Sequence, residues 1–181
     1  MNHLYEKTIK SNSIYSGKII DLQVDEVELP NGKTSKREII KHPGAVAILP
    51  ITTEGKLILV RQFRKALEKT IIEIPAGKLD AGEEPADCAK RELAEETGYV
   101  TDNLDFLLSF YTSPGFADEL IYMYVATGLT AGEVSRDEDE FLDVIEVTLE
   151  EAEEMVRDER IHDAKTAYAI QYMRLMKYLS K

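Results

Sequence analysis

The sequence predicts an α+β fold in which a mixed β-sheet lies between helices. Apolar runs of strand length fill the first third of the chain, one helical segment follows, and further strands precede two closing helices. Strands and helices do not alternate as in a doubly wound parallel sheet, which favours a mixed or antiparallel sheet sandwiched by helices. At 181 residues, with 44% hydrophobic and 31% charged residues, the chain is long enough to bury one full core.

The first predicted element is a β-hairpin. Residues 18–29 carry apolar residues at roughly alternate positions, and residues 34–42 form the returning strand. An Asn-Gly dipeptide, which is typical of hairpin turns, lies between them. We therefore predict an N-terminal antiparallel β-hairpin region over 1–43 and a main domain over 44–181.

The middle of the chain predicts three more strands and a helix. Residues 45–52 and 56–64 are joined by the turn sequence TEGK and are expected to form a second, more buried hairpin. Residues 70–77 predict a short buried strand that ends at its proline and glycine. Residues 85–97 predict a helix, because a proline begins the segment and a glycine follows it.

The last part of the chain predicts strands over 104–111, 119–129 and 141–149, followed by two helices. Thr148 and Glu151 have the spacing of a capping box at the start of the first helix. The second helix is expected to begin near residue 163 and to turn these residues toward the core: Ala167, Ile170, Met173, Leu175, Met176 and Leu179.

Composition excludes several classes of partner. The formal net charge of −12, from 34 acidic and 22 basic residues, repels polyanions and argues against nucleic acid. No apolar run reaches the ~18 residues of a membrane span, and the N-terminus lacks the apolar core of a signal peptide. A single cysteine, Cys88, cannot form an internal disulfide and is expected to be a small packed residue. These features favour the cytoplasm.

Three carboxylates crowd one side of the helix predicted over 85–97. At 100° per residue, Glu92, Glu95 and Glu96 span about 100°, beside an apolar stripe of Ala86, Ala89 and Leu93. Such carboxylates repel one another, and the end of a helix disfavours negative charge. A solvated acidic face is one interpretation. A site for a hard divalent cation such as Mg²⁺ or Mn²⁺ is the other, favoured by the glycine-containing loop before the helix, which can add carbonyl oxygens and a further carboxylate.

The segment from Gly77 to Tyr99, GKLDAGEEPADCAKRELAEETGY, resembles the sequence motif of the Nudix hydrolase family. The only departure is Tyr99, where an aliphatic residue is usual. The positions that fill the motif are Gly77, Glu83, Arg91, Glu92, Leu93, Glu95, Glu96, Gly98 and Tyr99. The resemblance implies the Nudix fold, an α/β/α sandwich with a mixed β-sheet between helices, here preceded by the N-terminal hairpin.

The resemblance also implies hydrolysis of a nucleoside diphosphate linked to a further group, with more than one Mg²⁺ or Mn²⁺ ion. It implies that Arg91 orients the carboxylates through a salt bridge, with Glu83 as a partner, and that Gly98 lets the chain turn after the helix. Arg91 and Glu96 are assigned to catalysis. The implied metal ligands are the carboxylates of Glu92, Glu95 and Glu96 and the carbonyl of Ala76.

A second motif, YTSPGFADE, places Pro114 sixteen residues after Gly98 and resembles the ADP-ribose pyrophosphatase subgroup. The subgroup implies substrate contacts from Gly115 and Glu119. It also implies that a glutamate of the acidic loop over 137–140 activates the attacking water, with Glu138 as first choice and Glu140 as second. The acidic loop is not a calcium-binding EF-hand, because its sixth position is a leucine rather than glycine.

Further substrate contacts are expected at the phosphates from Arg61, Arg64 and Glu73, and at the adenosine end from Arg37 and Glu38. The subgroup implies a homodimer through the N-terminal strands. Two alternatives stay open: hydrolysis of another nucleoside diphosphate sugar or nucleotide, and a non-catalytic nucleotide-binding module. Nucleophilic catalysis has little support, because none of the three histidines shares a motif with a candidate nucleophile.

Overall fold

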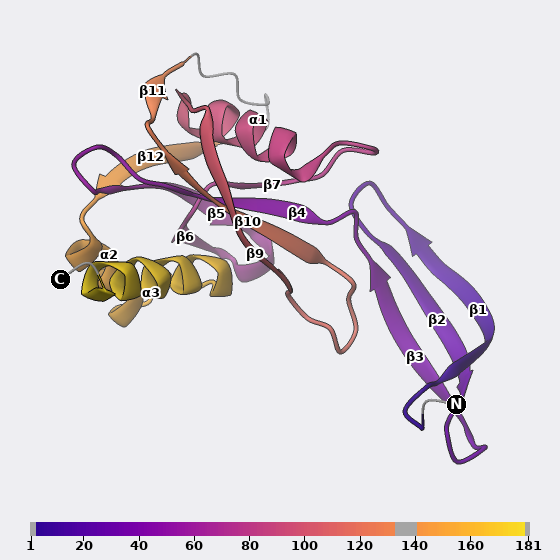
Figure 1. The fold of residues 1–181 in the computed structure, drawn as a ribbon. Coiled ribbons are helices and arrows are strands. Elements are labelled where there is room, and N and C mark those ends of the chain that lie inside the picture. The colour runs from indigo at the N-terminus through magenta and orange to yellow at the C-terminus, as the bar shows by residue number, and fades with distance from the viewer. Residues whose placement is uncertain (1–2, 133–140, 180–181) are drawn as a thin grey trace. The chain divides into compact units, whose positions relative to one another are not determined.

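The computed structural model describes residues 3–132 and 141–179 (Figure 1). The chain forms two compact units, which are described separately. Unit 1 is Met1–Gly44 with Phe110–Ile121, and unit 2 is Ala45–Ser109 with Tyr122–Lys181. In the described ranges, no helix combines the length and apolar character that crossing a membrane requires.

Unit 1 is built on a three-stranded antiparallel sheet in the order β1-β2-β3. The strands are β1 (Lys7–Ser16), β2 (Asp21–Glu28) and β3 (Thr34–Lys41). The predicted hairpin is confirmed as β2 and β3, and Gly32 adopts φ 79° in its turn. The sequence did not predict β1, because every residue of this strand is exposed and few are apolar. The segment over 110–121, a loop with the adjoining ends of the strands before and after it, contacts β3, where the Ile40 amide donates to the Phe116 carbonyl at 2.7 Å.

Unit 2 contains three sheets. A four-stranded sheet has the order β7-β4-β10-β9, a three-stranded sheet has the order β12-β5-β6, and β11 pairs with β8. The strands are β4 (Ala45–Pro50), β5 (Leu57–Arg64), β6 (Lys69–Glu73), β7 (Ala76–Lys78), β8 (Tyr99–Val100), β9 (Asn103–Tyr111), β10 (Leu120–Thr127), β11 (Thr130–Ala131) and β12 (Leu142–Val147). A short 3₁₀ turn, η1 (Lys65–Leu67), connects β5 and β6.

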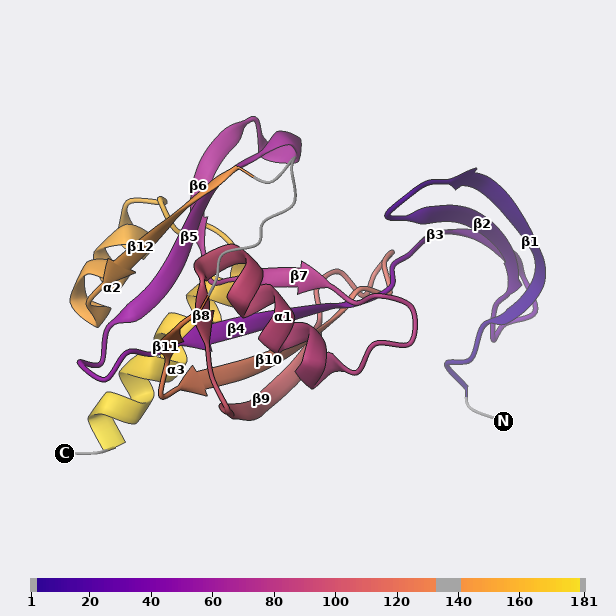
Figure 2. The ribbon, with the colours of Figure 1, turned by 90° about the horizontal axis from the view of Figure 1, so that it is seen from above.

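Helices cover both faces of unit 2, as the sandwich prediction requires. Figure 1 shows α1 (Pro85–Thr97) on one side of the strands, with α2 (Leu149–Arg157) and α3 (Ala164–Leu179) on the other. Turned by 90°, Figure 2 shows α1 lying along β4 and β7. Every residue of β4 is buried, and α1 packs against this strand. The core beneath α1 consists of Val46, Ile48, Cys88, Ala89, Leu93, Tyr124 and Ala126.

The predicted hairpin over 45–64 is wrong beyond its turn. The turn forms, with the Thr52 amide donating to the Lys56 carbonyl at 2.9 Å. The flanking strands then enter different sheets, and only an isolated bridge between Ile51 and Leu57 joins them. Both edges of β4 are taken by β7 and β10, and both edges of β5 by β12 and β6. The turn therefore reverses the chain, but pairing with distant strands takes the place of the hairpin.

The predicted strand over 70–77 divides into β6 and β7 around Ile74 and Pro75. Pro75 has no amide proton, so the chain cannot continue one ladder through it. β6 pairs with β5, whereas β7 pairs with β4. The crossing is held in place on either side, since the Ile74 amide donates to Thr166 Oγ1 at 3.0 Å and the Pro75 carbonyl accepts from the Ile48 amide at 2.8 Å.

The predicted start and end of α1 are confirmed. Gly98 has φ 73°, and its amide donates to the Ala94 carbonyl at 2.9 Å, which closes the helix. The capping box of α2 is also confirmed, with Thr148 and Glu151 each accepting from the other's backbone.

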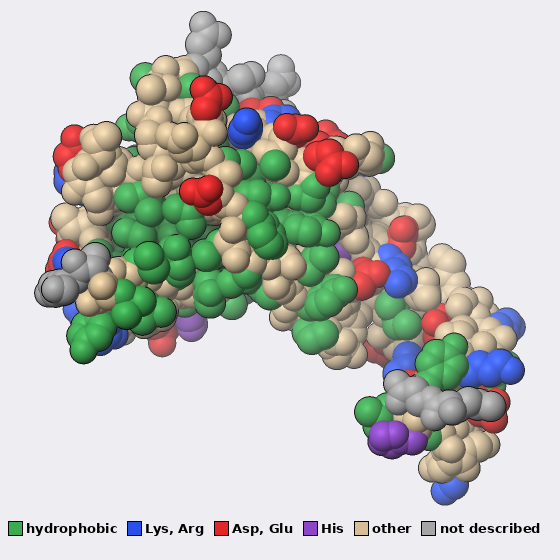
Figure 3. Space-filling model, viewed as in Figure 1, with side chains coloured by type: hydrophobic (Ala, Val, Ile, Leu, Met, Phe, Trp, Pro, Cys, Tyr) green, Lys and Arg blue, Asp and Glu red, His purple; other side chains and the backbone are tan. Residues whose placement is uncertain are grey.

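The predicted core face of α3 is only partly confirmed. Ile170 is buried, and Ala167 and Met173 are half-buried. Leu175, Met176 and Leu179 are exposed, because the amphipathic pattern of a helix does not reveal how far its neighbours extend beneath it. Figure 3 shows further apolar surface on unit 2, in green, along the side where β9 forms the sheet edge.

Candidate functional site

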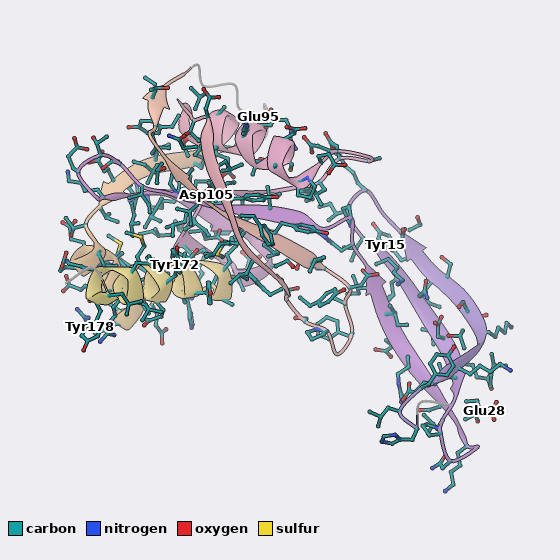
Figure 4. The ribbon with its side chains drawn as sticks, viewed as in Figure 1. Tyr15, Glu28, Glu95, Asp105, Tyr172 and Tyr178 are labelled. Atoms are coloured by element: carbon teal, nitrogen blue, oxygen red, sulfur yellow. The ribbon has the colours of Figure 1, made fainter. Side chains whose placement is uncertain are left out.

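The three carboxylates of the motif, Glu92, Glu95 and Glu96, lie on α1 at different depths. Glu92 and Glu96 are 8% and 1% exposed, whereas Glu95 is partly exposed and projects from the helix (Figure 4). The helix therefore buries two of the carboxylates rather than presenting all three to solvent. The predicted apolar stripe is wrong at Ala86, which is exposed. Cys88 lies one helical turn before the buried Glu92, on the buried side of α1, and packs in the core instead.

Arg91 is the centre of this group of acidic side chains. Its Nε and Nη2 donate to the two oxygens of Glu83, both at 2.9 Å, in a bidentate ion pair. Its Nη1 donates to Glu92 at 2.8 Å and to Glu95 at 2.9 Å. Nη2 also approaches the Lys78 carbonyl and the Cys88 sulfur, each at 3.3 Å. The structure thus brings Arg91 together with three of the predicted site carboxylates.

The electrostatics follow from these contacts. The hydrogen bonds from Arg91 lower the pKa of Glu83 to about 2, so this carboxylate stays ionised at neutral pH. The same carboxylate raises the pKa of Arg91 above its usual range. Burial raises the pKa of Cys88 to about 12, which keeps the thiol protonated and unsuited to nucleophilic attack.

The short strand β7 positions the two buried carboxylates. The Ala76 amide donates to Glu96 Oε2 at 3.0 Å, so the residue predicted to offer its carbonyl also holds a carboxylate through its N–H. A Cβ added to Gly77 would lie 1.8 Å from Cδ of Glu92, which means that only glycine leaves room for this side chain. Gly77 and Glu92, both residues of the motif, therefore pack directly against each other.

The donor chemistry fits a hard divalent cation. Glu92, Glu95, Glu96 and the Ala76 carbonyl are all oxygen donors of the kind that Mg²⁺ and Mn²⁺ prefer. The cradle at Gly77 keeps the Glu92 carboxylate beside β7. Within 3–132 and 141–179, no three acidic, histidine or cysteine side chains are arranged as metal ligands, and Arg91 bridges Glu92 and Glu95 instead.

The predicted phosphate contacts divide between two environments. Arg64 donates to the buried Glu73 at 2.6 Å, and Lys165 of α3 donates to the other oxygen of Glu73. Arg61 donates to Asp143 of β12 at 2.6 Å and is exposed. Arg61 and Arg64 are three residues apart on β5, so their side chains point to opposite faces of the sheet. The structure groups Arg64 with Glu73 and leaves Arg61 apart.

Four predicted substrate contacts lie in unit 1. Arg37 forms a bidentate ion pair with Glu6, at 2.8 and 2.6 Å, and Glu38 is exposed on the same strand. Gly115 lies in the loop over 110–121, where a Cβ would meet no atom within 4 Å. Glu119 accepts from Thr112 Oγ1 at 2.6 Å, which ties the two ends of that loop together.

Glu138 and Glu140, the predicted bases, lie outside the described residues. Two functional candidates were missed in the sequence: Lys165 and Thr166 at the start of α3, which contact Glu73 and Ile74. They belong to no contiguous motif, because 92 residues separate them from their partners. A polar pair in the first turn of the last helix was the only available signal.

Comparisons with known proteins match nearly the full length of the chain. The model of the NUDIX domain matches residues 41–169, and that of the nucleoside diphosphate sugar hydrolase N-terminal domain matches residues 6–40. The chain is 60% identical over 181 residues to an ADP-ribose pyrophosphatase of Bacillus subtilis (strain 168), covering 99% of this chain and 98% of that protein. It is 57% identical over 176 residues to a methanol dehydrogenase activator of Bacillus methanolicus, covering 96% and 95%.

A solved structure supports the fold independently. The crystal structure of an ADP compounds hydrolase superposes with a TM-score of 0.84 and covers 98% of this chain and 96% of that one. Its sequence identity of 23% limits this likeness to the fold. The motif around Arg91, the NUDIX match over 41–169 and the relatives that align over nearly the full length agree, and the chain belongs to the Nudix hydrolase family.

Proposed function

We propose that this chain hydrolyses the pyrophosphate bond of ADP-ribose to AMP and ribose 5-phosphate. The observation that carries this is the complete carboxylate group around Arg91 on α1, in a chain that is 60% identical to an ADP-ribose pyrophosphatase over 99% of its length. Two of the carboxylates proposed as metal ligands are buried, where an ionised group is costly and a bound cation would offset that cost. Glu92 and Glu96 are 8% and 1% exposed.

The reaction adds water across the bond between the two phosphates. The water oxygen bonds to one phosphorus, the bond from that phosphorus to the bridging oxygen breaks, and the second phosphate leaves with that oxygen. A bound divalent metal supplies neutralisation of the phosphate oxygens and a lowered pKa for the water. Glu92, Glu95, Glu96 and the Ala76 carbonyl would hold more than one Mg²⁺ or Mn²⁺ ion.

The remaining residues bind the substrate, orient the carboxylates or accept the proton of the water. Arg91 orients the carboxylates through its ion pair with Glu83. Glu138, or failing that Glu140, takes the proton of the water. Arg64, oriented by Glu73, contacts a phosphate, because an arginine fork matches phosphate oxygens. The further substrate contacts in this proposal are Arg37, Glu38, Arg61, Gly115 and Glu119.

The dimer predicted from the sequence also belongs to this proposal. The edge strand β1 is exposed along its whole length, with Ile9, Ile14 and Tyr15 each more than half exposed. Apolar side chains on an unpaired edge strand favour association with another chain. We propose a homodimer through the N-terminal strands.

The test is a substrate panel with product identification. Purified protein is incubated with ADP-ribose, ADP-glucose, GDP-mannose and nucleoside triphosphates, with Mg²⁺ or Mn²⁺. We expect AMP and ribose 5-phosphate from ADP-ribose, and a loss of about 10²-fold in kcat for Glu96→Gln with the fold unchanged by circular dichroism. Preference for another diphosphate sugar would move the substrate assignment, and turnover of no diphosphate would remove the enzyme assignment.

A second candidate is activation of a methanol dehydrogenase, which the 57% identical relative favours. The measurement is the rate of a purified methanol dehydrogenase with and without this chain. If activation disappears in Glu96→Gln, activation depends on the same carboxylates as hydrolysis, and the two candidate functions are linked. An unchanged rate of the methanol dehydrogenase would rule out the second candidate, and hydrolysis would be the one that remains.

A further inference from the structure

The backbone that leads to Ala76 is held by hydrogen bonds from three alternate amides. Ile72 lies in β6, the outer strand of its sheet, Ile74 lies in the crossing to the next sheet, and Ala76 begins β7. The Ile72 amide donates to the Arg160 carbonyl at 2.9 Å, and the Ile74 amide donates to Thr166 Oγ1 at 3.0 Å. The Ala76 amide donates to Glu96 at 3.0 Å. The last of these bonds holds the Glu96 carboxylate, and the first two fix the backbone that leads to Ala76.

Thr166 is the buried partner in this series. The side chain is fully buried, and Ile74 is 1% exposed, so no water can replace the hydroxyl as acceptor. Pro75 follows Ile74, and its carbonyl accepts from the Ile48 amide at 2.8 Å. Proline restricts the backbone of both residues. A shift at Ile74 is therefore transmitted to Ala76 and then to Glu96.

The neighbouring residue, Lys165, contacts Glu73, which is the ion-pair partner of Arg64. Its ammonium group donates to Glu73 and to Asp163, the latter at 3.0 Å. Glu73 is 3% exposed and accepts from Arg64 Nε on its other oxygen, at 2.6 Å. Two cations thus share one buried carboxylate, and Lys165 holds the oxygen of Glu73 that Arg64 does not use.

We propose that the first turn of α3 is a positioning element of the hydrolase site. Thr166 positions Glu96 through the backbone of Ile74 to Ala76, and Lys165 positions Arg64 through Glu73. This inference rests on the proposed function and deepens it, because it separates control of the metal-binding carboxylate from control of the phosphate contact. Neither residue touches the reacting atoms.

The roles proposed for Thr166 and for Lys165 predict different kinetic effects. Thr166→Val keeps the shape of the side chain and removes the acceptor, and we expect Mn²⁺ affinity and kcat to fall roughly 10-fold with KM for ADP-ribose nearly unchanged. Thr166→Ser keeps the hydroxyl and should recover most of both. Lys165→Met keeps the length of the side chain and removes the charge, and we expect KM to rise roughly 5-fold with Mn²⁺ affinity unchanged, while Lys165→Arg recovers KM.

Mn²⁺ affinity is measured by electron paramagnetic resonance without substrate, so it reports on the carboxylates even if ADP-ribose is not turned over. Ala169→Gly is the matched control, because it weakens α3 at another fully buried position and removes no hydroxyl group. A purely structural role predicts that Thr166→Val and Ala169→Gly lower Tm alike and leave Mn²⁺ affinity alone, which would overturn the inference. If Thr166→Val does not fold, the Lys165 pair decides: a KM equal to that of the unmodified chain overturns it.

Discussion

At the scale of single residues, the ion pair between Glu83 and Arg91 makes a prediction about pH. The folded pKa of Glu83 is about 2, below its usual value of 4.5. A lowered carboxyl pKa stabilises the fold above pH 4.5, and that stabilisation is lost as the pH falls toward 2. We expect Glu83→Gln to reduce the free energy of unfolding by about 1.5–3 kcal/mol at pH 7, because a bidentate charged bond is lost.

The loss should shrink as the pH falls, since protonation removes the same charge from the unmodified chain. Urea unfolding of both proteins at pH 7, 4 and 3 measures the difference. Glu84→Gln is the control, because Glu84 is exposed and its side chain makes no capping hydrogen bond to α1. A difference between Glu83→Gln and the unmodified chain that stays constant from pH 7 to pH 3 would contradict the assignment.

Residue by residue, the sequence revealed the part of the site that is contiguous. The segment from Gly77 to Gly98 places its arginine and carboxylates at helix spacing, so their meeting in space follows from one helix and the strand before it. Lys165 and Thr166 could not be predicted, because their contacts with Glu73 and Ile74 span 92 residues. Such contacts depend on how the final helix docks, which local patterns do not encode.

At the scale of elements, the contact between β7 and α1 makes a second prediction. Gly77→Ala places a methyl group where the Glu92 carboxylate lies, 1.8 Å from its Cδ. The glutamate is long and can swing aside, so we expect Tm to change by only a few degrees. Mn²⁺ affinity should fall roughly 10- to 100-fold, because the displaced carboxylate is a proposed ligand.

A double-mutant cycle tests this cause. In a Glu92→Ala background, Gly77→Ala has no carboxylate to displace and should cause no further loss of Mn²⁺ affinity. Additive losses in the double variant would show that Gly77 acts through the backbone of β7 rather than through Glu92.

The elements also show where local patterns succeed and where they fail. The helix over 85–97, the hairpin of β2 and β3 and the capping box of α2 were predicted, because their signals lie within a few residues of the structure they determine. The hairpin over 45–64 was not formed, because both strands find partners elsewhere in the chain. Turn chemistry fixes a reversal of the chain, whereas sheet membership is decided by long-range packing.

At the scale of the whole molecule, the two family matches divide the chain near residue 40, and the N-terminal part carries the exposed strand β1. Ile14 is 59% exposed and Tyr15, labelled in Figure 4, is 57% exposed. An isologous dimer would bury each of these residues twice, once in each subunit. Burial of one isoleucine stabilises association by about 1.5–3 kcal/mol.

We therefore expect Ile14→Lys to raise the Kd of the dimer by roughly 100-fold or more, because both copies of the contact are lost. Sedimentation velocity over a range of concentrations measures this. Leu67→Lys is the matched control, since Leu67 is 53% exposed but lies in η1 of unit 2. Equal Kd values for the two variants would place the interface elsewhere, and a monomeric unmodified chain at tens of micromolar would remove the dimer. A variant that dissociates but keeps its kcat and KM would further show that each subunit forms a complete site without its partner.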